Sequence, residues 1–118
     1  MGWDGRAPGL AVALDTFRNG RDPSSNFVGL ATGRDTAHPD SLVWAATSRR
    51  VPALRGATRH VDVVVSVGTV TVSIDGTQML AAAVALPPSV LIGFTGADGW
   101  LTDRHSITNV SIAAAPPR

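Results

Sequence analysis

The residues best able to do chemistry lie close together near the start of the chain, where Asp15, Asn19 and Asp22 fall within eight residues. They offer two carboxylates and one amide oxygen, and the backbone between them adds a carbonyl. Hard oxygen ligands of this kind suit calcium far better than zinc or copper. Calcium is therefore the metal ion that these residues could hold. The alternative is an Asx-rich turn, in which Asn19-Gly20 and Asp22-Pro23 serve the backbone alone.

The elements that position these residues are expected to be strands throughout the chain. Alternating apolar residues, many of them β-branched, with turn residues at the breaks, form the strand and hairpin pattern. This pattern predicts strands over residues 10–17, 26–32, 41–47, 60–67, 70–74, 78–86, 90–95 and 107–112. Hairpin turns are predicted at Gly68-Thr69 and Asp75-Gly76. Short strands separated by turns argue for an all-β sandwich.

Composition bounds the class of protein. The 118 residues suffice for one domain with a core of its own, ending in an Ala/Pro tail at 113–118. Hydrophobic residues make up 44% and charged residues 16%, the profile of a folded, turn-rich domain rather than a disordered one. Every basic residue is Arg and every acidic residue is Asp. Cysteine is absent, which excludes disulfide and thiol chemistry, and the Arg and Ala bias favours a bacterial source.

Charge and hydropathy exclude two classes of partner. The net charge of +1 gives no strong field, although Arg49, Arg50, Arg55 and Arg59 form a local basic cluster. No nucleic-acid motif or stacking aromatic accompanies these arginines, so we interpret them as a solvated edge and expect no nucleic-acid partner. No run of about 20 apolar residues exists, so membrane insertion is not expected. The first residues also lack the basic and apolar regions of a signal peptide.

Two co-linear parts of the chain resemble the legume-type (L-type) lectins. Residues 10–30 are similar to the family's metal loop, which runs roughly V-E-x-D-T-x-x-N…D-P…H-x-G. Residues 59–80, RHVDVVVSVGTVTVSIDGTQML, and 85–112, ALPPSVLIGFTGADGWLTDRHSITNVSI, resemble the long strand pair and G-F-(S/T) loop of its C-terminal half. The resemblance implies a concanavalin A-like jelly roll of antiparallel strands, here a partial one.

The resemblance also implies a ligand set for each metal of the family. Its calcium ligands fall on Asp15, the backbone carbonyl of Phe17, Asn19 and Asp22. The Glu and His of its transition-metal site are replaced by Ala13 and Phe27. No transition metal is therefore expected, and calcium affinity should be reduced because the second metal supports the calcium loop.

A carbohydrate site is implied beside the calcium loop. Its contacts would come from Phe17, Asn19, Asp98, Gly99 and Trp100. Trp100 and Phe17 are the candidates to stack on a pyranose ring, and the alternative for Trp100 is a core or interface position. The chain resembles only the second half of the family's domain, so a larger bacterial surface or secreted protein is the expected context. Unpaired edges of a partial sandwich would favour self-association.

No catalytic residue is predicted. Glycoside hydrolases of the same fold need a carboxylate pair, and this chain has no Glu, while Asp15 and Asp22 are better explained as ligands or turn formers. His38, His60 and His105 lack metal-ligand spacing, and His105 is expected to be structural. Two functions remain: a calcium-dependent carbohydrate-binding module, which the metal loop favours, and a structural or adhesive β-sandwich without a ligand.

Overall fold

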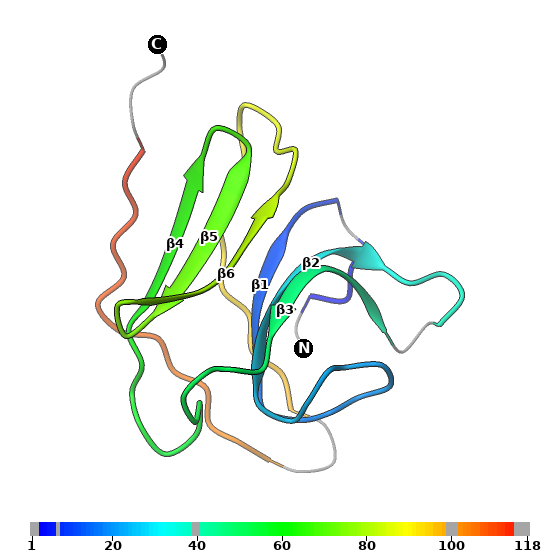
Figure 1. Ribbon diagram of the computed structural model, residues 1–118, viewed down its shortest axis with the longest axis vertical. Coiled ribbons are helices and arrows are strands. Elements are labelled where there is room, and N and C mark those ends of the chain that lie inside the picture. Colours follow the sequence, from blue (N-terminus) through cyan, green and yellow to red (C-terminus); the bar gives the residue numbers. More distant parts are fainter. Residues whose placement is uncertain (1–2, 7, 39–40, 99–101, 115–118) are drawn as a thin grey trace.

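The computed structural model describes residues 3–6, 8–38, 41–98 and 102–114, and these form an all-β protein. Six antiparallel strands make two three-stranded sheets, each a meander in which neighbours in sequence pair (Figure 1). Sheet A contains β1 (Ala11–Asp15), β2 (Phe27–Arg34) and β3 (Leu42–Ser48). Sheet B contains β4 (Val61–Ser66), β5 (Thr69–Ile74) and β6 (Thr77–Ala83). In the described part of the chain, no helix is long and apolar enough to cross a membrane.

The first six predicted strands are confirmed, with ends that move by a few residues. The β5–β6 turn lies at Asp75-Gly76 as predicted, with φ angles of 50° and 80°. The β4–β5 turn lies at Val67-Gly68, one residue earlier than predicted, with φ angles of 50° and 75°. Two successive residues with positive φ are the signature of a type I′ turn, which suits the twist of a two-residue hairpin. These turns fix the register of sheet B.

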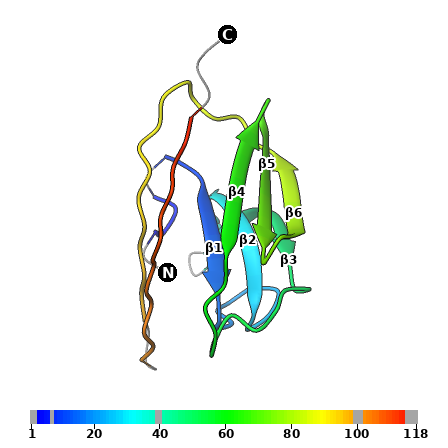
Figure 2. The ribbon, with the colours of Figure 1, turned by 90° about the vertical axis from the view of Figure 1, so that its left-hand side faces the viewer.

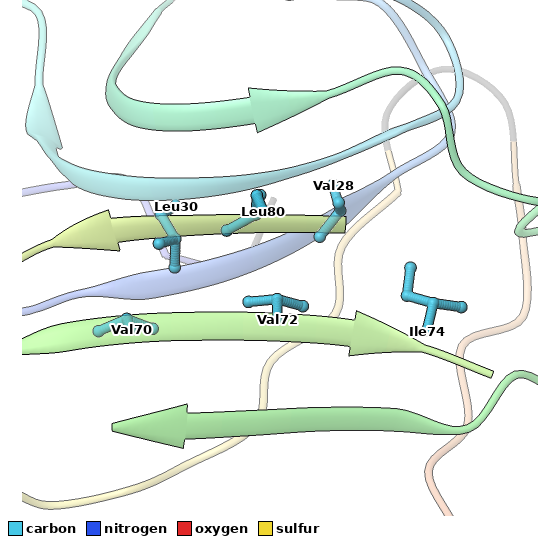
Figure 3. Packing of buried hydrophobic residues seen from close by; sticks show 6 residues of the cluster. All are labelled: Val28, Leu30, Val70, Val72, Ile74 and Leu80. Carbon is cyan, nitrogen blue, oxygen red and sulfur yellow. The ribbon is translucent and has the colours of Figure 1, made fainter. Parts of the chain in front are cut away.

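The two sheets pack face to face around a small core (Figure 3). The core is made of Val28, Leu30, Val70, Val72, Ile74 and Leu80. The three core residues of β5 are fully buried. By contrast, only Val61 of β4 packs against the core, whereas Val63 and Val65 are about half exposed. The two sheets therefore form a small β-sandwich, and the jelly-roll topology stays a prediction.

Two predicted strands, 90–95 and 107–112, are wrong. Neither segment is part of a sheet, and the second bends at Asn109, whose φ is 53°. In Figure 2 they run on one side of the molecule, beyond the edges of the sheets at β1 and β4. Apart from the half-buried Asp103, every described residue from 87 to 114 is exposed. Their sequence has the alternation of a strand, but no tight turn joins either segment to a neighbour, and Pro87-Pro88 removes two backbone donors after β6.

Candidate functional site

A cavity of about 430 Å³ lies against sheet A and contains three of the predicted site residues. It is lined by Trp3, Asp4, Arg6, Asp15, Asn19, Gly20, Asp22, Arg34, Ser41 and Leu42. Asp15 is paired with Phe27 across β1 and β2, and both lie on the face opposite Val28, a residue of the core. The cavity is therefore on the outer face of sheet A, away from sheet B.

The loop between β1 and β2 is shaped by short-range hydrogen bonds. The backbone N–H of Asp22 donates to the carbonyl of Asn19 (2.8 Å), and the Asn19 N–H donates to Oδ2 of Asp22 (2.9 Å). Arg18 Nε donates to the Asp22 carbonyl (3.0 Å). The Arg21 N–H donates to the hydroxyl of buried Ser41 (3.3 Å), which ties the loop to the start of β3. These contacts aim the Asp22 side chain inward, beneath the loop.

Asp22 is the unusual group of the cavity, because an aspartate is seldom fully buried. Only 6% of this residue is exposed. Burial raises the pKa of its carboxyl group above the ordinary value, and the nearby Asp15 carboxylate raises it further. The Asn19 N–H acts in the opposite direction by stabilising the charged form. Two carboxylates that repel each other in a partly dry site are an arrangement that a bound cation would relieve.

The remaining predicted calcium ligands are placed less favourably for direct capture. Asp15 Oδ1 accepts a hydrogen bond from the Phe17 N–H (2.9 Å), an Asx-type turn contact, and the Asn19 side chain is exposed. Within the described ranges, no three His or Asp side chains gather closely enough to hold a metal by themselves. Calcium here would draw on the Asn19 amide and a backbone carbonyl as well as on two carboxylates. The donor set fits that ion chemically.

An aromatic pair lies on the outer face of sheet A, although neither of its residues lines the cavity. The rings of Phe27 and Trp44 meet edge to face, with centroids 5.3 Å apart and an interplanar angle of 82°. Gly29 lies between them in β2, and a Cβ there would come within 2.5 Å of the Trp44 ring. Trp44 Nε1 is buried and has no hydrogen-bond partner among the described residues. Ala13 and Phe27, the positions where the lectin resemblance would place transition-metal ligands, are both buried apolar residues.

Sequence reasoning missed the residues that the N-terminal segment and the β2–β3 connection bring to the cavity. Gly5 has a φ of 78° and lies so close to the backbone of Gly33 and Arg34 that a Cβ would come within 2.7 Å of it. This close approach carries Trp3, Asp4 and Arg6 to the site. Arg6 Nε pairs with Asp4 Oδ2 at 3.2 Å. A glycine flanked by tryptophan and charged residues was the available signal, but only the fold shows what it faces.

The other predicted sugar contacts lie apart from this cavity or outside the described residues. Asp98 Oδ1 contacts Nε2 of His105 at 2.8 Å, beside a second cavity of about 430 Å³ lined by Phe94, Thr95, Gly96, His105, Ser106 and Ile107. Gly99 and Trp100 lie outside the described residues. Phe17 is half exposed and is not among the residues that line the first cavity. The structure therefore brings together Asp15, Asn19 and Asp22 and leaves Asp98 outside the cavity lining, whereas Gly99 and Trp100 stay predictions.

Several other charged groups form ion pairs. His38 pairs with Asp35 at 3.1 Å and His60 with Asp62 at 3.2 Å. From the basic cluster, Arg59 pairs with Asp75 and Arg55 with Asp103, each at 3.0 Å.

Comparison with known proteins finds no match: no family model, no curated protein and no solved structure is similar to this chain.

Proposed function

We propose that this protein is a carbohydrate-binding β-sandwich whose ligand site is the cavity on the outer face of sheet A. The observation that carries the proposal is the gathering of Asp15, Asn19 and buried Asp22 around one cavity. Calcium would be held there by these three side chains and the Phe17 carbonyl. Bound calcium would supply positive charge that neutralises the two carboxylates and orders the loop.

The protein's own groups suit a polyhydroxylated ligand. Asn19 and Ser41 carry side chains that both donate and accept hydrogen bonds, as sugar hydroxyls do. Arg6 adds fixed donors at the cavity wall, and Trp3 offers an apolar ring of the kind that packs on a pyranose face. A cavity with an aromatic wall and a few convergent polar groups is the usual form of a small-ligand site.

A structural β-sandwich without a ligand is the second candidate, and one observation favours it. The hydrogen bonds from Phe17 N–H to Asp15 and from Asn19 N–H to Asp22 satisfy the loop without any ion. In that case both aspartates would serve only the turn.

Thermal unfolding of the full chain with calcium and with chelator separates the two candidates. Calcium at about 100-fold over its Kd should add about 2.7 kcal/mol of stability. Asp15→Asn and Asp22→Asn should remove this response, and Asp62→Asn is the matched control, because Asp62 is an exposed carboxylate on β4, outside the cavity lining. A calcium-sensitive melt should be followed by a glycan array with and without chelator. A wild-type melt that ignores calcium would reject the calcium site.

Without calcium, the raised pKa of Asp22 predicts how the stability of the fold depends on pH. The folded-state pKa of Asp22 is raised, so its charged form is disfavoured in the folded protein, and this penalty is present above the folded pKa. The penalty fades as the pH falls towards the unfolded value, near 3.9. Asp22→Asn keeps an acceptor for the Asn19 N–H and removes the buried charge. We therefore expect this variant to melt at a higher temperature than the wild type at pH 7 without calcium.

A further inference from the structure

Trp44 has a donor that the fold buries but does not use. Its indole Nε1 is inaccessible and makes no hydrogen bond within the described part of the chain. A buried donor without a partner is rare in folded proteins, and such a group calls for an explanation. The acceptor for this donor must lie close by, because the Trp44 ring packs against Gly29 and Phe27.

The ring of Trp44 is directed towards the loop that carries Asp22. The Cα partner of Trp44 across the sheet is Ala31, yet its ring lies over Gly29 and meets Phe27, four residues along β2 from Ala31. Phe27 is in turn paired with Asp15, at the end of sheet A where the loop begins. The indole therefore extends diagonally over β2, towards the end of sheet A where the loop begins.

Asp22 is the acceptor next to this donor. The indole N–H of Trp44 stabilises the charged carboxylate and so lowers its pKa, against the larger effect of burial. Trp44 Nε1 nonetheless makes no hydrogen bond of ordinary geometry. The Asn19 N–H already holds Oδ2 of the same carboxylate. A carboxylate can accept about four hydrogen bonds, so room remains for the indole and for a cation.

We propose that Trp44 is a positioning residue of the candidate site, whose buried indole N–H takes up the Asp22 carboxylate and fixes its orientation between β3 and the loop. This inference deepens the proposed function and rests on it for its consequence in calcium binding. Groups that hold a metal ligand from behind restrict its orientation and raise affinity without touching the metal. Removing such a group is expected to weaken metal affinity by about 10-fold or more.

The test is the indole resonance of Trp44 in the full, ¹⁵N-labelled chain. The chain has three tryptophans, so the Trp44 signal is the one that remains after Trp3→Phe and Trp100→Phe are assigned. In chelator, Asp22→Asn should move this resonance, because the acceptor changes while the aromatic pair stays. An unmoved Trp44 resonance in folded Asp22→Asn would overturn the inference, whatever calcium does.

Measurements with calcium test whether Trp44 affects calcium binding. They also separate the inference about Trp44 from the proposed function. Calcium should move the Trp44 resonance in the wild type but not in Asp22→Asn, and Trp44→Phe should bind calcium about 10-fold more weakly. Equal calcium affinity in folded Trp44→Phe and wild type would contradict a positioning role. Absence of calcium binding in the wild type, with a Trp44 resonance that moves in Asp22→Asn, would reject the proposed function and support the Trp44–Asp22 contact. If Trp44→Phe fails to fold, the Asp22→Asn comparison decides.

Discussion

Residues 61–83 and residues 90–112 share the apolar, β-branched composition of strands, but their described residues differ in structure. Both stretches are rich in alternating β-branched and apolar residues. The first forms all of sheet B and supplies four of the six core side chains, whereas the described residues of the second lie outside both sheets and, apart from Asp103, are exposed. The difference lies in the connections, because two-residue type I′ turns lock the first stretch into register. Alternation alone marks a segment that can become a strand, and pairing requires a partner held at the right distance.

The largest effect should come from matched isoleucines in the two stretches. Ile74 is fully buried on β5, and Ile92 is 61% exposed. Ile74→Ala should cost about 2–5 kcal/mol, because it leaves a cavity between the sheets. Ile92→Ala should change stability by about 0.5 kcal/mol or less. Urea unfolding of both variants measures the contrast, and equal losses would mean that residues 90–95 are packed as a strand.

Gly29 on β2 and Gly93 in the C-terminal segment allow a second comparison between a packed and an open position. Gly29→Ala would drive a methyl group into the Trp44 ring, with heavy atoms 2.5 Å apart, so we expect a loss of about 1–3 kcal/mol. Gly93 has open space around the position of a Cβ. Gly93→Ala should therefore be neutral or slightly stabilising, since it reduces the freedom of the unfolded chain. Thermal melts compare the two, and a neutral Gly29→Ala would contradict the placement of Trp44.

The smallest expected effect is a difference in acid sensitivity between two exposed aspartates. Hydrogen bonds from the His60 N–H and from Arg59 lower the pKa of the Asp75 carboxyl group, and contacts with the Asp103 backbone and His105 lower that of Asp98. A lowered folded pKa gives stability that is present above the unfolded value of about 3.9 and is lost as the pH falls through the folded value.

Only Asp75 should affect the free energy of unfolding. Its partners, Arg59 and His60, lie directly before β4, while the partner of Asp98 lies outside the sheets. Asp75→Asn should therefore lower stability at pH 7 and reduce the further loss between pH 5 and acid pH, measured by urea unfolding. Asp98→Asn is the matched control. A comparable loss in Asp98→Asn would show that the C-terminal segments unfold together with the sheets.

Sequence reasoning found six strands because their signals are local. Period-two patterns in residues 61–83 and glycine-containing turns such as Asp75-Gly76 are complete within a few residues. It failed for residues 90–95 and 107–112, where the outcome depends on a distant edge rather than on the segment. The candidate site divides in the same way. Asp15, Asn19 and Asp22 were predicted together because one loop holds them.

The rest of the cavity comes from parts of the chain that only the fold unites. Trp3 and Arg6 arrive through the close approach of Gly5 to β2, and Ser41 through its bond to the loop. From the sequence, Trp44 is only an apolar residue in a predicted strand. Its proposed role as a positioning residue depends on its ring lying over Gly29. Contacts of this kind are set by packing and leave no spacing in the sequence.

Amide hydrogen exchange of the full chain, with calcium and with chelator, tests the central claim most directly. The claim is that a rigid sandwich presents a calcium-dependent loop at residues 15–22. We expect slow exchange in β5 and the core of β2 under both conditions, fast exchange in residues 90–112 under both, and protection of residues 15–22 that rises only with calcium. Exchange in that loop that is identical with calcium and with chelator would contradict the account.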